Sequence, residues 1–148
     1  MDQTREAAGS RDSEPADLVL PTVGGFVQLP QSWDSSAGKI QNLVEHACGG
    51  VGVLQSAALE TRANHSHKQD WHYLYCISGS FQYLEWSLEY PYSLQDKDRV
   101  DLRVRAGQMI FTPPMRNHEL RFIEHTVMIS ISKLSRTHAE HETDVVRL

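Results

Sequence analysis

Short apolar segments separated by turn-forming residues make up most of this chain, and this pattern limits the folds that it can adopt. Segments such as residues 26–29, 53–57 and 72–77 are rich in β-branched, aromatic and aliphatic side chains, and Gly, Pro, Ser and Asp separate them. Residues 99–104 alternate charged and apolar side chains, as a half-exposed strand does. Only residues 135–142 are expected to form a short helical turn. The sequence therefore predicts an all-β sandwich or barrel.

The chain of 148 residues suits one domain with one core. Residues 1–16 are polar, mixed in charge and without apolar periodicity, so we expect a disordered tail before a single domain over residues 17–148. The N-terminus has no apolar h-region and no apolar run is long enough to span a bilayer, so we expect a cytoplasmic protein. Cys48 and Cys76 are expected to be reduced, with Cys76 buried in the strand over residues 72–77.

The charge of the chain bears on its partners. Its formal net charge is −5, and no cluster of Lys and Arg suits the phosphates of a nucleic acid. We therefore expect neither a nucleic-acid nor a membrane partner. A small anionic substrate is compatible with this composition, because one or two basic residues can hold a diphosphate.

Three histidines fall close together in Asn64-His65-Ser66-His67-Lys68-Gln69-Asp70-Trp71-His72. Residues i and i+2 of a strand point to the same face, so His65 and His67 project together. His72 opens the next strand and can supply a third imidazole, a ligand that suits zinc, iron, copper and nickel. From the residues alone, a metal site and packed or surface histidines both remain open. Four other histidines, His46, His125, His138 and His141, are expected at the surface.

Two spacings resemble the motifs of the cupin family. The first is His65-x-His67-(four residues)-His72-(six residues)-Gly79, and the second is Gly107-(five residues)-Pro113-x-Met115-x-x-His118. This resemblance implies a double-stranded β-helix, or jelly-roll barrel, with a ligand cavity inside it. It also implies a divalent metal ion (Zn, Fe, Ni or Mn) on His65, His67, His72 and His118. Two residues depart from the usual motifs: His72 replaces a Glu ligand, and Met115 replaces a Gly.

A second resemblance is to cupins of deoxysugar and capsular-polysaccharide pathways, including the nucleotide-sugar 3,4-ketoisomerases. It rests on Arg62-Ala63-Asn64-His65-Ser66-His67-Lys68 and on Thr112-Pro113-Pro114-Met115-x-x-His118-Glu119. The likeness implies that Arg62 contacts a nucleotide diphosphate and that His65 or His67 moves a proton beside a sugar ketone. Ketoisomerases of this type work without a metal and carry Gln where this chain has His72. His72 thus favours a metal, whereas Arg62 and Lys68 favour a sugar nucleotide.

The leading hypothesis is a metal-binding cupin enzyme, an isomerase or epimerase of a small oxygen-rich substrate such as a nucleotide-linked sugar. One alternative is an Fe(II)-dependent oxygenase or metal-dependent lyase, and another is a non-catalytic ligand-binding cupin. The predicted catalytic residues are His65, His67 and Tyr73. The predicted substrate contacts are Arg62, Lys68 and Tyr83. A homodimer is expected from the resemblance.

Overall fold

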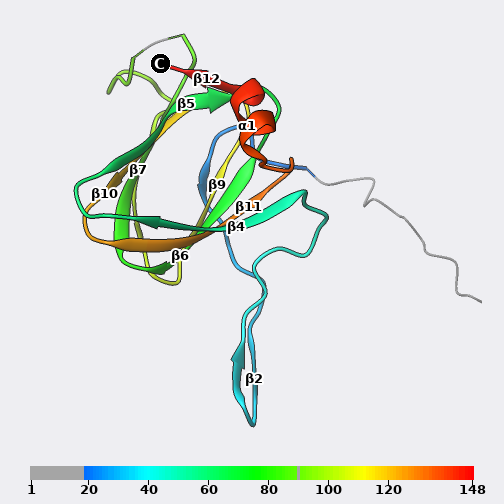
Figure 1. The fold of residues 1–148 in the computed structure, drawn as a ribbon. Coiled ribbons are helices and arrows are strands. Elements are labelled where there is room, and N and C mark those ends of the chain that lie inside the picture. The colour runs from blue at the N-terminus through cyan, green and yellow to red at the C-terminus, as the bar shows by residue number, and fades with distance from the viewer. Residues whose placement is uncertain (1–18, 90) are drawn as a thin grey trace, which may run out of the picture.

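The structure is a computed structural model that describes residues 19–89 and 91–148, so the tail predicted over residues 1–16 lies outside the described residues. Two five-stranded sheets pack face to face, and every pair of neighbouring strands is antiparallel (Figure 1). The first sheet has the order β1-β9-β6-β11-β4. Its strands are β1 (Gly25–Phe26), β9 (Met109–Thr112), β6 (His72–Ser78), β11 (Thr126–Ser132) and β4 (Gly50–Ser56).

The second sheet has the order β12-β5-β10-β7-β8. Its strands are β12 (Val145–Arg147), β5 (Thr61–His67), β10 (Asn117–Phe122), β7 (Ser80–Trp86) and β8 (Val100–Arg105). Strands β2 (Trp33–Ser35) and β3 (Gly38–Ile40) form a separate hairpin that extends away from the barrel (Figure 1). The single described helix, α1 (His138–Asp144), lies beside β12 (Figure 1). The all-β prediction is confirmed.

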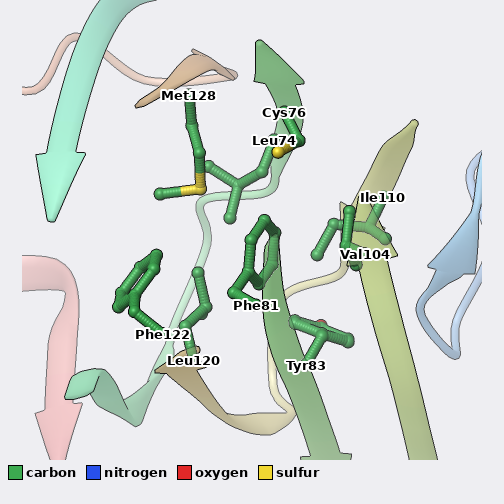
Figure 2. Close-up of a cluster of buried hydrophobic side chains, with 9 residues drawn as sticks. All are labelled: Leu74, Cys76, Phe81, Tyr83, Val104, Ile110, Leu120, Phe122 and Met128. Atoms are coloured by element: carbon green, nitrogen blue, oxygen red, sulfur yellow. The ribbon is translucent and has the colours of Figure 1, made fainter. Parts of the chain in front are cut away.

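The main core lies between the two sheets. Its buried side chains point toward one another in Figure 2 and come from both sheets: Leu74, Cys76, Phe81, Tyr83, Val104, Ile110, Leu120, Phe122 and Met128. Cys76 is fully buried, as predicted, and neither cysteine forms a disulfide.

A second apolar cluster covers the outer face of the first sheet. It contains Trp71, Tyr73, Met109, Phe111 and Ile131, and the N-terminal residues Leu20, Val27, Leu29, Leu43 and Val44 pack against it. The period of two along β6 explains why Leu74 and Cys76 belong to the inner core while Tyr73 and Tyr75 belong to this outer cluster.

The second motif holds a strained turn next to the first motif. Met115 has a φ of 61°, in the left-handed region where glycine is favoured. Its backbone N–H donates to the carbonyl oxygen of His67 at 2.7 Å. Met115 therefore has the backbone conformation that the Gly of the usual motif would adopt most easily. Its N–H group also links the turn to β5 through His67.

Candidate active site

Four histidine rings meet inside the barrel, as the two motifs predict. His65 and His67 come from β5, His72 from β6 and His118 from β10, and all four are buried. His118 stands directly opposite His65 in the register of β10 and β5. The ring centroids lie 4.8 Å apart for His65–His67 and for His65–His118, and 5.3 Å apart for His72–His118.

The strand that carries two of these rings is locally irregular. The register of β10 and β5 shifts between His118 and Glu119, so that Asn64 forms a bulge just before His65. Ala63 and Asn64 both have positive φ, at 68° and 58°. Bulges of this kind re-aim side chains beside functional sites. Ala63, His65 and His67 all line the cavity.

Hydrogen bonds fix the ring protons of two histidines. His67 Nδ1 lies 3.1 Å from Asp144 Oδ2, and His118 Nδ1 lies 3.3 Å from the carbonyl oxygen of Arg116. Carboxylate and carbonyl oxygens only accept hydrogen bonds, so the proton of each neutral ring sits on Nδ1. Each Nε2 then carries a lone pair. The buried His67 Nε2 has no hydrogen-bond partner among the described residues.

Three of the four histidines have the arrangement that a metal ion requires. The ligand nitrogens of His65, His67 and His118 lie within 4.8 Å of one another, and all three residues are buried. His65 Nδ1 and His67 Nε2 are buried without partners among the described residues. The oxygens that bind His67 Nδ1 and His118 Nδ1 are the kind of outer partner that metal-bound histidines have. These residues fit a divalent ion, whereas His72 does not belong to this close group.

The cavity favours uncharged imidazoles. Burial, followed by the nearby His67, lowers the pKa of His65 from 6.5 to about 3. Burial and then Arg136 lower the pKa of His67 to about 4, although Asp70 and Asp144 oppose the shift. Burial likewise holds the pKa values of His72 and His118 well below 6.5. At neutral pH the four rings are therefore neutral, which is the state that can bind a metal or accept a proton.

The C-terminal segment completes the site, and sequence reasoning missed its contribution. Arg136 and His141 line the cavity, and the His141 ring is 6.0 Å from that of His65 and 5.7 Å from that of His67. His141 was expected at the surface, but it is half-buried on α1, and burial followed by Arg136 lowers its pKa. Thr137 precedes this helix and caps it, because its side chain accepts from the N–H of Glu140.

The same segment supplies the carboxylate that orients His67. Burial alone would raise the pKa of Asp144, but the N–H groups of Gln69 and Asp70 and the ring of His67 lower it instead. Asp144 therefore stays ionised at neutral pH and holds the His67 proton on Nδ1. No local periodicity marks Asp144, because it lies 77 residues after His67 and only the fold brings the two together.

The two predicted sugar-contacting cations lie near the rim. Arg62 lines the cavity and is exposed, and its side chain donates to Ser56 Oγ at 2.5 Å and to the Gln55 carbonyl at 2.7 Å. Lys68 is exposed and donates to the Thr143 carbonyl at 3.2 Å, beside a different hollow. Only Arg62 therefore reaches the histidine cavity directly.

The two predicted tyrosines do not line the cavity. Tyr73 lies on the outer face of β6, where its hydroxyl is 2.9 Å from His46 Nε2, so the structure does not bring it to the histidines. The reason is strand alternation, because His72 points inward and its neighbour must point outward. Tyr83 is fully buried in the core, where its hydroxyl contacts Glu85 Oε1 at 2.6 Å and Thr112 Oγ1 at 2.9 Å. Its ring stacks 6.5 Å from that of His118.

A larger groove adjoins the histidine cavity. The cavity itself has a volume of about 150 Å³, and the groove has about 580 Å³. Both are lined by Leu54 and Arg136. Small residues such as Gly52 and Ser130, which pair between β4 and β11, leave the groove open. Together the two spaces match the roughly 300–1,000 Å³ that is usual for ligand sites.

Comparison with solved structures identifies the fold. The sugar 3,4-ketoisomerase QdtA from Thermoanaerobacterium thermosaccharolyticum, in complex with TDP, is 14% identical with a TM-score of 0.66, over 87% of this chain and 90% of that chain. A dTDP-4-dehydrorhamnose 3,5-epimerase from Sulfolobus tokodaii is 12% identical with a TM-score of 0.60, over 79% of this chain and 78% of that chain. The rmlC epimerase of Mycobacterium tuberculosis is 11% identical with a TM-score of 0.66, over 86% and 69%.

These proteins have the cupin fold, so the jelly roll implied by the two sequence motifs is confirmed. No protein-family profile and no curated protein matches the sequence. Among the described residues, no helix has the length and apolar character needed to cross a membrane.

Proposed function

Starting from a cupin barrel with a cavity of neutral histidines, we propose that the chain is an isomerase or epimerase of a nucleotide-linked keto sugar. The observation that carries this proposal is the group formed by His65, His67 and His118, whose ligand nitrogens converge within 4.8 Å. The solved structures with this fold include sugar isomerases and epimerases that bind TDP or TDP sugars. The comparisons favour neither the oxygenase or lyase alternative nor the non-catalytic one.

In this proposal His65, His67 and His118 hold a divalent metal ion. Such an ion would polarise a substrate carbonyl and so make the neighbouring C–H group more acidic. Asp144 and the carbonyl oxygen of Arg116 keep the ring protons of His67 and His118 on Nδ1, which leaves Nε2 to face the ion.

His141 is the base in this scheme. Isomerisation next to a carbonyl needs a group that takes a proton from carbon and returns it at another position, with a pKa not far from 7. His141 lines the cavity beside His65 and His67, and its lowered pKa keeps it neutral at pH 7. Because α1 carries it at the rim rather than on the barrel wall, it can reach a substrate that enters from the groove.

The substrate's size and charge follow from the two connected spaces. The cavity of about 150 Å³ suits the reacting ring alone, and the groove of about 580 Å³ takes the nucleotide part. Arg62 lines the cavity and contributes positive charge for a diphosphate. Arg62→Ala should therefore raise KM more than it lowers kcat, because this contact is made equally in the ground and transition states.

The experiment combines metal content with solvent exchange. Elemental analysis of protein purified without a histidine tag should find about one divalent ion per chain. Incubation with keto-deoxysugar nucleotides in D₂O should place deuterium next to the carbonyl. His141→Gln should lower kcat by about 10²–10⁴-fold, and His125→Gln, at an exposed histidine, is the matched control.

Two results would count against the proposal. Absence of both turnover and deuterium uptake with every keto-sugar nucleotide would remove the isomerase assignment. Full activity in protein that contains no metal would remove the metal part and transfer the base role to His67, whose Nε2 lone pair is already set by Asp144.

We also propose that two copies of the chain pair through the first sheet. Its edge strand β4 exposes Val51 and Val53, at 70% and 65%, and the hairpin exposes Trp33 and Ile40 opposite each other. An open strand edge with apolar side chains favours pairing with a second copy. Light scattering after size-exclusion chromatography should give twice the chain mass, and Val53→Lys should give the monomer. A monomeric wild-type protein at micromolar concentration would contradict this pairing.

A further inference from the structure

His72 differs from the other three histidines in its hydrogen bonding. Arg136 Nη2 lies 2.9 Å from His72 Nδ1. A guanidinium has donors only, so His72 Nδ1 must accept this hydrogen bond. The proton of the neutral His72 ring therefore sits on Nε2, which is the opposite assignment to that of His67 and His118.

The Arg136 side chain is held in place from its other side. Its Nε donates to Asp70 Oδ2 at 2.9 Å, and Asp70 Oδ1 accepts from the N–H of Leu134 at 3.0 Å. Asp70 is only 2% exposed, so the carboxylate end of this ion pair is buried, whereas the Arg136 side chain is partly exposed. Both partners of Arg136 therefore constrain the guanidinium, and the direction of its hydrogen bond to His72 is fixed.

The remaining nitrogen of His72 faces the cavity. The ring lines the cavity, with its centroid 5.4 Å from that of His67 and 5.3 Å from that of His118. Because Arg136 occupies Nδ1, Nε2 is the nitrogen of His72 that is left for a ligand. A nitrogen that carries a proton has no lone pair for a metal, and removing the proton would leave an imidazolate. This chemistry agrees with the absence of His72 from the close group of ligand nitrogens.

We propose that His72 is a hydrogen-bond donor to the substrate oxygen that becomes negatively charged during the reaction, and is not a fourth metal ligand. Arg136 is its positioning residue and also contributes positive charge behind the ring. The proton stays on His72 throughout, and the bond to the oxygen strengthens as charge develops on it. The identity of that oxygen, in an enediolate-like intermediate, rests on the proposed function. The assignment of the ring proton does not.

Metal binding tests this assignment without any substrate. Co²⁺ is titrated into metal-free wild type and into His72→Gln, His72→Leu and His118→Gln, and visible absorbance is recorded. We expect the two His72 variants to bind Co²⁺ within about threefold of the wild type, and His118→Gln to bind at least about 100-fold more weakly. Loss of Co²⁺ binding in both His72 variants, matching His118→Gln, would make His72 a ligand and overturn the proposal.

The ring protons can be read directly by long-range ¹H–¹⁵N NMR spectra of the metal-free protein. We expect His72 to carry its proton on Nε2 and His67 and His118 to carry theirs on Nδ1. Arg136→Met should alter the His72 nitrogen shifts and leave the Co²⁺ affinity nearly unchanged. A His72 ring protonated on Nδ1 would overturn the proposal, even if the leucine variant failed to fold.

Kinetics of the metal-loaded protein then test the role in the reaction. His72→Leu should lower kcat by about 10²–10³-fold with little change in KM, because a donor that acts mainly in the transition state is lost. His72→Gln, which keeps an N–H donor, should recover a substantial part of that loss. If no sugar nucleotide is turned over, the proposed function fails, while the Co²⁺ and NMR results still decide whether His72 is a donor. An unchanged kcat in an active, metal-loaded His72→Leu would also overturn the donor role.

Discussion

Mild acid should destabilise the metal-free protein far more than it destabilises an ordinary β-barrel of this size. The buried rings of His65 and His67 have pKa values of about 3 and 4, whereas the unfolded chain has the ordinary value of 6.5. Below pH 6.5 the unfolded chain therefore binds protons that the folded cavity does not bind. It follows that the free energy of unfolding falls as the pH falls from 6.5 toward 4.

The size of the effect follows from the gap between the two pKa values. At pH 5, which is 1.5 units below the unfolded value and still above both folded values, each of His65 and His67 accounts for a loss of about 2 kcal/mol. The two together give about 4 kcal/mol, and His72 and His118 shift in the same direction. A domain of this kind has a total stability of about 5–15 kcal/mol. Asp144 does not contribute to the loss between pH 6.5 and 5. Its pKa is lowered by folding, so the stability that its ionised form provides is lost only at a more acidic pH.

Urea unfolding of EDTA-treated protein, followed by tryptophan fluorescence between pH 7.5 and 5.0, measures this loss. We expect the unfolding midpoint to fall by about 1.3–4 M, given slopes of about 1–3 kcal/mol per molar urea. The double variant His65→Gln/His67→Gln should show a flatter pH profile, and the exposed-site variant His125→Gln should follow the wild type. A wild-type stability that changes by less than about 1 kcal/mol over this range would contradict this prediction, as would a double variant as acid-sensitive as the wild type.

Four further predictions concern the frame around the cavity. Gly79→Ala should lower the free energy of unfolding, measured with urea, by more than about 2 kcal/mol, because φ at this position is +89° and the new Cβ would meet a backbone oxygen at 2.4 Å. Gly107→Ala has a similar φ of +85° but open space around the new Cβ, so it should cost only about 1 kcal/mol. Met115→Gly should raise the melting temperature, because it relieves about 1 kcal/mol of left-handed strain. Glu85→Leu should cost about 3–5 kcal/mol by the same urea assay, since it leaves Arg116 buried without its carboxylate at 2.9 Å, and a loss below 1 kcal/mol would contradict this. Zn²⁺ at about 100 times its Kd should add about 2.7 kcal/mol to the free energy of unfolding, and EDTA should remove the gain in a thermal-shift assay.

The barrel and its inner histidines could be predicted because both depend on local rules. A period of two places His65 and His67 on one face, and the spacing to His118 is that of a recurring motif. The same period of two puts Tyr73 on the face of β6 opposite to His72, and therefore outside the cavity. The prediction of a catalytic Tyr73 rested on the chemistry of its side chain and did not apply this alternation. Tyr83 obeys the alternation but lies too deep to meet a substrate.

The C-terminal partners could not be predicted, because their positions depend on contacts far apart in the chain. Asp144 reaches His67 because β12 pairs with β5, setting Val145 opposite His67. Arg136 reaches His72 because Asp70, which follows the first two histidines, holds it by an ion pair. Neither residue lies in a periodic segment, and a polar stretch such as residues 135–142 gives the same pattern whether it covers a cavity or faces solvent.

Two charged residues of the C-terminal segment, Arg136 and Asp144, make the cavity histidines chemically different from one another. The carboxylate of Asp144 accepts from His67 and leaves a lone pair on Nε2, whereas the guanidinium of Arg136 donates to His72 and leaves a proton on Nε2. Both apolar clusters are complete by Ile131, so the barrel core does not need the segment that carries these charges. The barrel therefore sets where the rings lie, and the C-terminal segment sets which ring accepts and which donates. If all four histidines had their ring proton on the same nitrogen, each would offer a ligand the same group. In this cavity His67 and His118 offer lone pairs on Nε2, whereas His72 offers an N–H group.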